Sequence, residues 1–242
     1  MTAVHIIESP SPRDISDGKT EGRALCEYFR LSNTPHSYSM TVNVEQFLRS
    51  IDLSDENNEI RKNIVQRHPP IIHLSIHGDG NGIQLTDGTV LSWDDLRILF
   101  TTMNEILPDG LMLAFSTCGG ASSIRMSMLE DEKSKPFYAT VGSFEAISWN
   151  DALVAFTVFY HNWFKNMPLE YCANAMRIAS GHNGFSSYSG LEQKQFYINY
   201  VQNQRIIEAL TRVSPPHTPG PQTTADWLGS ILIPPDDTPD ED

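Results

Sequence analysis

The sequence Ile-Ile-His-Leu-Ser-Ile-His-Gly at residues 71–78 decides the fold of this chain, together with Leu-Met-Leu-Ala-Phe-Ser-Thr-Cys-Gly-Gly at residues 111–120. Each stretch starts with an apolar run, which is typical of a strand that is covered on both faces of a sheet. Each stretch ends on a reactive side chain followed by glycine, His77 in the first and Cys118 in the second. The two stretches therefore predict two buried strands with a histidine and a cysteine at their ends.

The segment between these strands has the apolar spacing of a helix over residues 92–107, and Ser92 with Asp95 resembles a capping box at its start. A strand, a helix and a strand form a crossover, so the two strands run parallel and end at the same edge of the sheet. Reacting groups in such sheets collect beyond the carboxyl ends of the strands. We therefore expect His77 and Cys118 to meet there as a catalytic dyad.

These motifs resemble those of the caspase-like superfamily of cysteine peptidases, which includes caspases, metacaspases, legumains, separases and CHAT domains. A third motif, Phe-Glu-Ala-Ile-Ser-Trp-Asn-Asp at residues 144–151, resembles the Ser-Trp-Arg segment of caspases and the Val-x-Asp segment of CHAT domains. The resemblance covers roughly residues 1–210. It implies an α/β fold, a three-layer αβα sandwich with a mostly parallel sheet of about six strands, and the activity of a cysteine endopeptidase.

For that activity we expect Cys118 to be the nucleophile, because the small residues on both sides leave room for a substrate carbonyl. His77 is the expected general acid and base, which takes the thiol proton and then protonates the leaving amine. The resemblance implies an oxyanion hole made by the backbone N–H groups of Gly78 and Cys118. His73 lies on the same side of the strand as His77 but deeper, and we expect it to belong to the core.

Four residues are expected to bind the substrate: Ser116, Glu145, Asn150 and Asp151. Caspases that cut after aspartate carry Gln and Arg at the positions of Ser116 and Asn150, so a cationic pocket is not expected here. A carboxylate from Glu145 or Asp151 at the base of the pocket would instead select Arg or Lys in the substrate. We hypothesise cleavage after a basic residue, while Asp151 has an equally good alternative role as a cap of the following helix.

Two other functions remain open at this point. An α/β-hydrolase with a cysteine nucleophile would explain the elbow-like spacing of Ser116, Cys118 and Gly120, with His161 or His182 as its base. A catalytically inactive caspase-like scaffold would bind partners through the acidic tail of the chain.

No cofactor is expected. His73, His77 and Asp79 resemble part of a zinc site, but a second cluster of ligands is missing. Asp79 and Asn81 resemble the start of a calcium loop, yet no glutamate closes it at the required spacing. We therefore expect no metal.

The charges also limit the function. The chain has 242 residues, with 17 Lys and Arg against 30 Asp and Glu, and this acidic balance argues against nucleic-acid binding.

Three cysteines at no metal spacing argue against a disulfide framework and favour a reducing, cytoplasmic location. Neither a signal peptide nor a membrane span is expected. The expected partners are a protein or peptide substrate and a regulatory protein, since related bacterial proteases act in stress, antiviral defence or cell death.

We expect a peptidase domain over residues 1–212 and a Pro-rich acidic tail over residues 213–242, because the last 29 residues hold seven of the 15 prolines. The charged loop at residues 130–136 falls where caspases are processed, with Lys133 and Lys135 as candidate cleavage sites. Loops are expected at residues 8–18 and 181–190. The other predicted strands cover residues 3–7, 37–44 and 137–143, with an optional strand over residues 196–201. The other predicted helices cover residues 20–31, 119–129, 151–164, 169–180 and 191–210, and residues 45–67 are predicted to be helical with an interruption by the polar stretch at residues 52–58.

Overall fold

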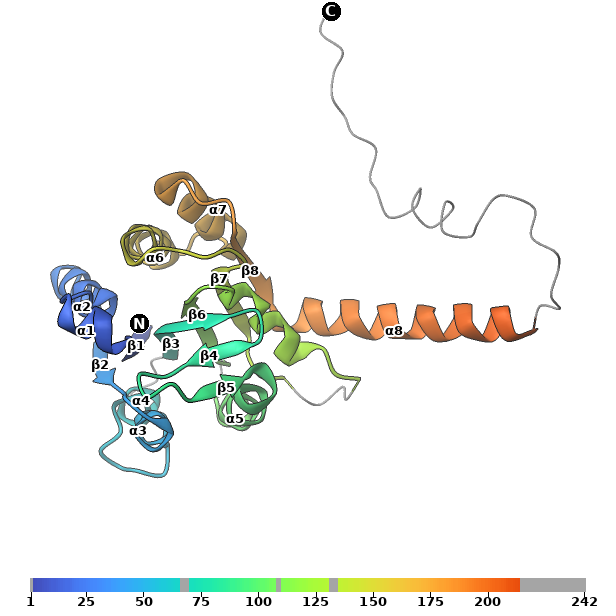
Figure 1. Cartoon of the computed structure of the whole chain (residues 1–242), viewed down its shortest axis with the longest axis horizontal. Helices are drawn as coiled ribbons and strands as arrows, with labels where there is room; N and C mark the ends of the chain where they lie inside the picture. Colours follow the sequence, from blue (N-terminus) through green and yellow to red (C-terminus); the bar gives the residue numbers. More distant parts are fainter. Residues whose placement is uncertain (1, 66–69, 108–109, 131–134, 214–242) are drawn as a thin grey trace, which may run out of the picture. The chain divides into compact units, whose positions relative to one another are not determined.

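The computed structural model describes residues 2–65, 70–107, 110–130 and 135–213 (Figure 1). The chain divides into two compact units, Met1–Asn199 and Tyr200–Asp242. The helix α8 (Gly190–Val213) begins in the first unit and continues into the second. Residues 214–242 lie outside the described residues, so the domain boundary after residue 212 stays a prediction.

The first unit is built on a mostly parallel sheet whose main path has the order β2-β1-β3-β6-β7-β8. The strands of this path pair in parallel, except that β8 runs antiparallel to β7. A short hairpin, β4 with β5, extends from the end of β3. The strands are β1 (Ala3–Ser9), β2 (His36–Met40), β3 (Pro70–Asp79), β4 (Gly82–Gln84), β5 (Val90–Ser92), β6 (Met112–Ser116), β7 (Ala139–Ser143) and β8 (Phe185–Ser189).

Helices cover both faces of the sheet, which makes the fold a three-layer αβα sandwich as predicted (Figure 1). One face carries α2 (Glu21–Leu31), α6 (Trp149–Trp163) and α7 (Leu169–Ser180). The other carries α3 (Val44–Ser50), α4 (Glu59–Val65), α5 (Trp93–Ile106) and the 3-10 helix η1 (Gly120–Ser127). A short helix, α1 (Pro12–Ser16), follows β1.

The strand β3 shows why the apolar runs are unbroken. Alternate residues point to opposite faces, so Ile72 and Leu74 join the core under α5 while Ile71 joins the core under α6. His73 also faces α6, where it is fully buried and its Nδ1 lies 2.9 Å from the hydroxyl of Tyr160. The prediction that His73 belongs to the core is therefore confirmed.

The crossover from β3 to β6 brings the two reactive residues together at one edge. Ser92 caps α5, and a capping box between Ser92 and Asp95 is present as predicted. The strands β3 and β6 are in parallel register, with Ser75 opposite Ser116. His77 and Cys118 therefore each lie two residues beyond this last pair, at the carboxyl edge of the sheet.

Several boundaries differ from the predictions. Residues 181–190, expected as a loop, contain β8, because this serine-rich segment pairs along β7. The prediction of an optional strand over residues 196–201 is wrong, since the helix α8 includes these residues. The interruption predicted at residues 52–58 is confirmed, since α3 ends at Ser50 and α4 begins at Glu59. The expected helix over residues 119–129 is the shorter η1. The loop predicted over residues 8–18 contains α1.

Candidate active site

His77 and Cys118 line the same cavity, which has a volume of about 390 Å³ and lies beyond the carboxyl ends of β3 and β6. The sheet supplies the floor of this cavity, and the segment before α6 supplies one wall. The complete lining consists of Lys19, Ile76, His77, Ser116, Thr117, Cys118, Ile147, Ser148, Trp149 and Asn150.

Two glycines shape the loops that carry these residues. Gly119 follows the cysteine in a left-handed conformation with φ 68°, and a Cβ there would lie 2.6 Å from the backbone carbon of Asp79. A Cβ on Gly78 would lie 2.5 Å from the carbonyl oxygen of Gly82 and 2.6 Å from Thr117 Oγ1. The loops after β3 and β6 therefore pack closely only because both positions are glycine.

Cys118 differs from the other two cysteines in its surroundings. Burial raises the pKa of the Cys26 thiol, and it raises the pKa of the Cys172 thiol to about 11 despite a backbone hydrogen bond that lowers it. Both are buried in the core, whereas Cys118 is half-buried and faces the cavity. Its Sγ lies 3.8 Å from the carbonyl oxygen of Ile147, within reach of a weak hydrogen bond. Cys118 is thus the cysteine that a substrate in this cavity meets.

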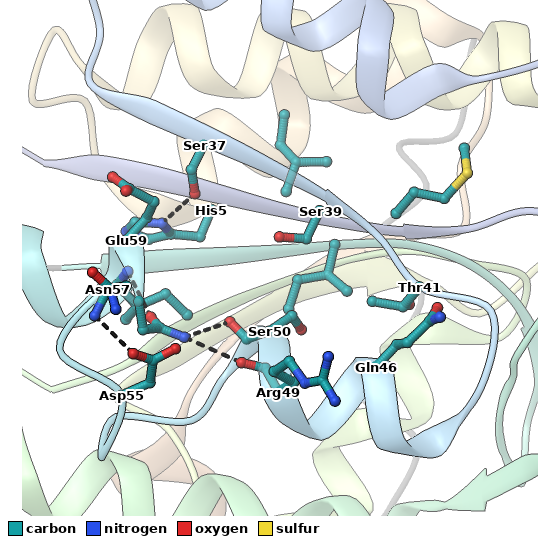
Figure 2. Close-up of a pocket in the computed structure, with 15 residues that line it drawn as sticks. His5, Ser37, Ser39, Thr41, Gln46, Arg49, Ser50, Asp55, Asn57 and Glu59 are labelled. Atoms are coloured by element: carbon teal, nitrogen blue, oxygen red, sulfur yellow. Dashed lines mark hydrogen bonds between the residues drawn. The ribbon is translucent and has the colours of Figure 1, made fainter.

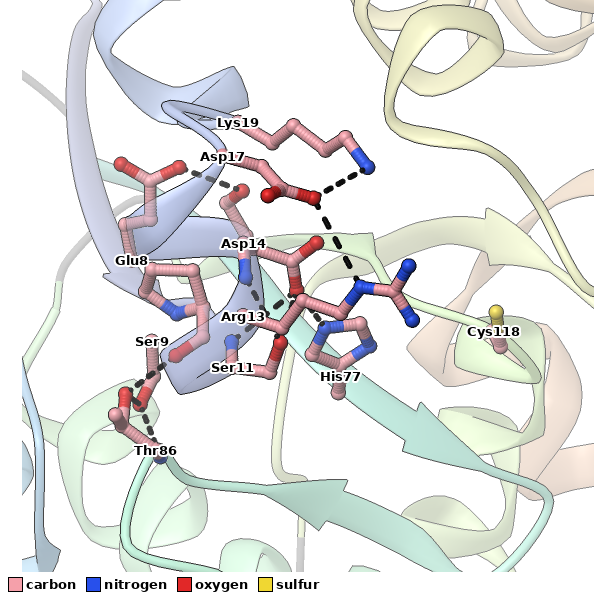
Figure 3. A network of polar contacts seen from close by, with 12 residues as sticks. Glu8, Ser9, Ser11, Arg13, Asp14, Asp17, Lys19, His77, Thr86 and Cys118 are labelled. Atoms are coloured by element: carbon pink, nitrogen blue, oxygen red, sulfur yellow. Dashed lines mark hydrogen bonds and ion pairs between the residues drawn. The ribbon is translucent and has the colours of Figure 1, made fainter.

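His77 is held by a carboxylate that the sequence analysis missed. The Nε2 atom of His77 lies 2.6 Å from Oδ2 of Asp14, on α1 (Figure 3). Ser11 caps α1 and forms a capping box with Asp14, which fixes the carboxylate over the end of β3. The Ser-x-x-Asp pattern at residues 11–14 was the available signal, but a capping box alone does not reveal what else the carboxylate binds.

Trp149 packs against the same histidine. Its ring centroid lies 5.1 Å from that of His77 in an edge-on arrangement, and Trp149 also hydrogen-bonds Asp14. Ser148 caps α6 and so places Trp149 as the first residue of the helix. The residues 144–151 were recognised as a motif, but the contact between Trp149 and His77 was not expected.

These contacts govern the charge of Asp14. Burial alone would raise the pKa of this carboxyl group. Hydrogen bonds from Ser11, His77 and Trp149, together with the charge of His77, outweigh burial and lower the pKa of Asp14 to about 2. Asp14 is therefore a carboxylate throughout the physiological pH range.

The predicted oxyanion donors lie beside the cavity. Gly78 belongs to the β3–β4 ladder opposite Ile83, next to His77. In the turn after β6, the N–H groups of Gly119 and Gly120 donate to the carbonyl oxygens of Glu145 and Thr117. These two donors are therefore engaged, and the assignment of Gly78 and Cys118 as oxyanion donors remains a prediction.

The four predicted substrate-binding residues separate into two pairs. Ser116 and Asn150 line the cavity. Glu145 and Asp151 do not belong to the described lining, and their carboxylates lie 3.3 Å and 3.8 Å from the ring of His182. Asp151 also accepts a hydrogen bond from Ser148 at 2.7 Å, so it takes part in capping α6.

Lys19 also lines the cavity, although no sequence pattern had indicated it. Its Nζ lies 3.2 Å from Oδ2 of Asp17, and 53% of its side chain is exposed. The cavity lining therefore includes a lysine that is paired with Asp17.

The histidines of the hydrolase alternative lie elsewhere. His161 is on α6, where its Nε2 lies 2.7 Å from Lys165 Nζ, and it lines a different cavity. His182 contacts Glu145 and Asp151 and is also outside the lining that the structure describes around Cys118. His77 is thus the histidine that shares a cavity with Cys118.

A second cavity, of about 360 Å³, lies over β1 and β2 beside α3 and α4 (Figure 2). His5 lines this cavity, and its Nδ1 lies 2.7 Å from Ser37 Oγ. Polar side chains such as Gln46 and Asp55 also line the cavity. Its lining contains no cysteine among the described residues, so it lacks the nucleophile that the first cavity has.

Neither a metal cluster nor a membrane span was found in the described parts of the chain. No group of three or more His, Cys, Asp or Glu side chains is arranged there to hold a metal ion. Asp79 Oδ1 instead accepts a hydrogen bond from the N–H of Asn81 at 2.7 Å. No helix in those parts has the length and apolar character needed to cross a bilayer.

The sheet topology defines an α/β sandwich, and the cavity lined by Cys118 and His77 is a candidate thiol active site at one strand edge. Among solved structures, the chain is similar to the crystal structure of the Drosophila initiator caspase Dronc, with a TM-score of 0.48 and 14% sequence identity. The match covers 78% of this chain and 80% of that chain. No protein-family model matches the chain. No curated protein matches it either.

Proposed function

We propose that this protein is a cysteine endopeptidase that hydrolyses peptide bonds in a protein substrate through His77 and Cys118. The observation that carries the proposal is the shared cavity, in which the half-buried thiol and a carboxylate-bound imidazole lie at the carboxyl edge of one sheet. Cysteine hydrolases need a thiol, a base and space for a carbonyl group, and the proposal is supported by a cavity that both Cys118 and His77 line.

The reaction follows the usual course of thiol acyl transfer. His77 takes the proton of Cys118, and the thiolate attacks the substrate carbonyl carbon to form a tetrahedral intermediate. The N–H groups of Gly78 and Cys118 stabilise the oxyanion. His77 then protonates the leaving amine as the C–N bond breaks, and a water molecule hydrolyses the remaining thioester with His77 again acting as base.

The preferred residue before the scissile bond is a basic one in this proposal. Lys19 lines the cavity, whereas Glu145 and Asp151 lie outside its described lining and contact His182. Lys19 pairs with Asp17 at 3.2 Å, whereas the two carboxylates share a histidine that is charged only if protonated. Glu145 is also 56% exposed, so an arginine or lysine of the substrate can reach it.

Regulation is the remaining part of the proposal, and it rests on the family resemblance. Related bacterial proteases are switched on in stress, antiviral defence or cell death, so a regulatory protein partner is expected for this chain as well. Processing in residues 130–136 would be one route to activation. Lys133 belongs to residues 131–134, which lie outside the described residues, while Lys135 is within the described part.

The proposal is tested by labelling and cleavage. A peptide with an electrophilic carbonyl warhead and a terminal arginine should form a stoichiometric adduct with the wild-type protein and none with Cys118→Ala. Fluorogenic peptides should be cleaved by the wild type only. An absence of both labelling and cleavage in the presence of cell extract would favour the inactive-scaffold alternative.

A further inference from the structure

The carboxylate of Asp14 contacts His77 and is held in place by hydrogen bonds from neighbouring residues. Its Oδ2 lies 2.6 Å from His77 Nε2 and also accepts hydrogen bonds from the hydroxyl and the N–H of Ser11, at 2.5 Å and 3.3 Å. Only 12% of the Asp14 side chain is exposed. Trp149 hydrogen-bonds the same carboxylate and packs edge-on against the imidazole. Three groups, the hydroxyl and the N–H of Ser11 and the side chain of Trp149, thus hold the carboxylate against one ring nitrogen of His77.

The nearby cations do not compete for this carboxylate. Arg13 and Lys19 both pair with Asp17, at 3.9 Å and 3.2 Å (Figure 3). Within the part of the chain that the structure describes, the ion pair recorded for Asp14 is with His77. The negative charge of Asp14 is therefore available to an imidazolium that forms when His77 accepts a proton.

The hydrogen bond also fixes which ring nitrogen is basic. An ionised carboxylate can only accept hydrogen bonds, so Nε2 of His77 must carry the hydrogen. In the neutral ring, Nδ1 is then the unprotonated nitrogen, and Figure 3 shows it on the side of the ring that faces Cys118. A basic nitrogen on that side can accept the thiol proton.

We infer that Asp14 is a positioning residue, the third member of a Cys118–His77–Asp14 triad that fixes the tautomer of His77 and stabilises its protonated form. The inference rests on the proposed function for its catalytic consequence. The coupling of Asp14 to Cys118 through His77, however, can be measured without a substrate. The same arrangement of nucleophile, imidazole and carboxylate occurs in other hydrolases, where exchanging the carboxylate for an amide lowers kcat by about 10⁴-fold.

The test compares Asp14→Asn with a matched control, Asp95→Asn. Asp95 has the same capping-box role in α5, where it accepts hydrogen bonds from the hydroxyl and the N–H of Ser92 at 2.6 Å and 3.0 Å, but it contacts no imidazole. Both variants lose a capping carboxylate, so an effect confined to Asp14→Asn reports the contact with His77. Thermal unfolding of both variants verifies that they are folded.

The first measurement is the rate of iodoacetamide alkylation of Cys118 as a function of pH. We expect the midpoint of this profile to move to higher pH by one unit or more in Asp14→Asn and to stay in place in Asp95→Asn. The second measurement is peptide cleavage, where we expect kcat to fall by about 10²–10⁴-fold with little change in KM. Asp14→Glu should recover part of the loss, because it restores the charge.

The outcomes of these measurements distinguish the inferred triad from the proposed function. An unchanged alkylation profile in a folded Asp14→Asn variant, or an equal shift in Asp95→Asn, overturns the inference. If the wild type cleaves no peptide but the alkylation midpoint still moves to higher pH in Asp14→Asn, the result supports the triad and counts against the proposed function.

Discussion

Ser75 and Ser116 lie opposite one another in neighbouring parallel strands, and this pairing sets the position of the candidate active site. Because both strands run in the same direction, the residues two positions further along, His77 and Cys118, reach the same edge of the sheet. A shift of one residue in this register would turn either side chain to the opposite face. The register of β3 and β6 is therefore a condition for the proposed chemistry.

The first prediction concerns the identity of the base. His77→Ala should reduce kcat/KM by about 10³-fold or more, because the imidazole that shares the cavity with Cys118 is removed. His182→Ala should retain activity within about tenfold, since His182 contacts Glu145 and Asp151 outside that cavity. Steady-state cleavage of a fluorogenic peptide measures both. Loss of activity in His182→Ala alone would support the hydrolase alternative.

The second prediction concerns thiol reactivity. In the folded protein, iodoacetamide should label Cys118 first, because burial raises the pKa of Cys26 and of Cys172 and removes both from solvent. Peptide mapping by mass spectrometry after brief labelling measures the site. In urea all three cysteines should react, which serves as the control. Early labelling of Cys172 in the native protein would contradict the packing described for α7.

A third prediction concerns substrate preference. Peptides ending in Arg or Lys should be cleaved faster than those ending in Asp or Ala. Glu145→Gln should reduce kcat/KM for the basic peptides by about tenfold, the size of one exposed charge-assisted contact. The quantity to compare is kcat/KM for the Arg peptide divided by kcat/KM for the Ala peptide. An effect of the substitution on His77 and Cys118 changes both values equally and so cancels in this ratio. Preference for Asp would reject the acidic pocket formed by Glu145 and Asp151 and point to Lys19 as the charge that selects the substrate.

The fourth prediction concerns Gly119. Gly119→Ala combines a left-handed φ of 68° with a Cβ that would lie 2.6 Å from the backbone of Asp79, so we expect a loss of about 1–3 kcal/mol in stability and a displaced Cys118. Gly88→Ala is the matched control, because Gly88 has φ 89° but no atom within 4 Å of the added Cβ. Denaturant unfolding measures stability, and equal losses in the two variants would exclude the close contact as the cause.

The fifth prediction concerns stability at acidic pH. Burial lowers the pKa of His5 from 6.5 to about 4, against a smaller opposing effect of Glu59. The folded protein thus keeps His5 neutral while the unfolded chain takes up a proton below pH 6.5. His5 therefore favours the folded state fully above pH 6.5, and this contribution is lost as the pH falls towards 4, by roughly 3 kcal/mol in total.

The measurement is the free energy of unfolding of the wild type and of His5→Gln between pH 4 and pH 7. Burial raises the pKa of Glu8 and so adds an opposite pH dependence, which cancels in the difference between the two proteins. The difference should change steadily across that window. A flat difference would show that His5 titrates normally in the folded state.

The sequence predicted the elements whose signals are local. The unbroken apolar runs at residues 71–76 and 111–115 indicated buried strands, and Ser92 with Asp95 indicated where α5 begins. Each of these signals lies within one turn or one strand, so it can be recognised without knowledge of the fold. The strand β8 had no such signal, because the Ser-rich sequence at residues 185–189 becomes a strand through its pairing with β7.

The sequence by itself determined the two reactive residues and the reason that they lie at one edge, because a parallel crossover has only one such edge for its two strand ends. Only the tertiary structure decided which groups surround them. Asp14 and His77 are 63 positions apart, and they meet because β1 pairs with β3 in parallel and α1 follows β1 over the end of β3. Such a contact depends on the spatial order of the strands, which local patterns of apolar and polar residues do not encode.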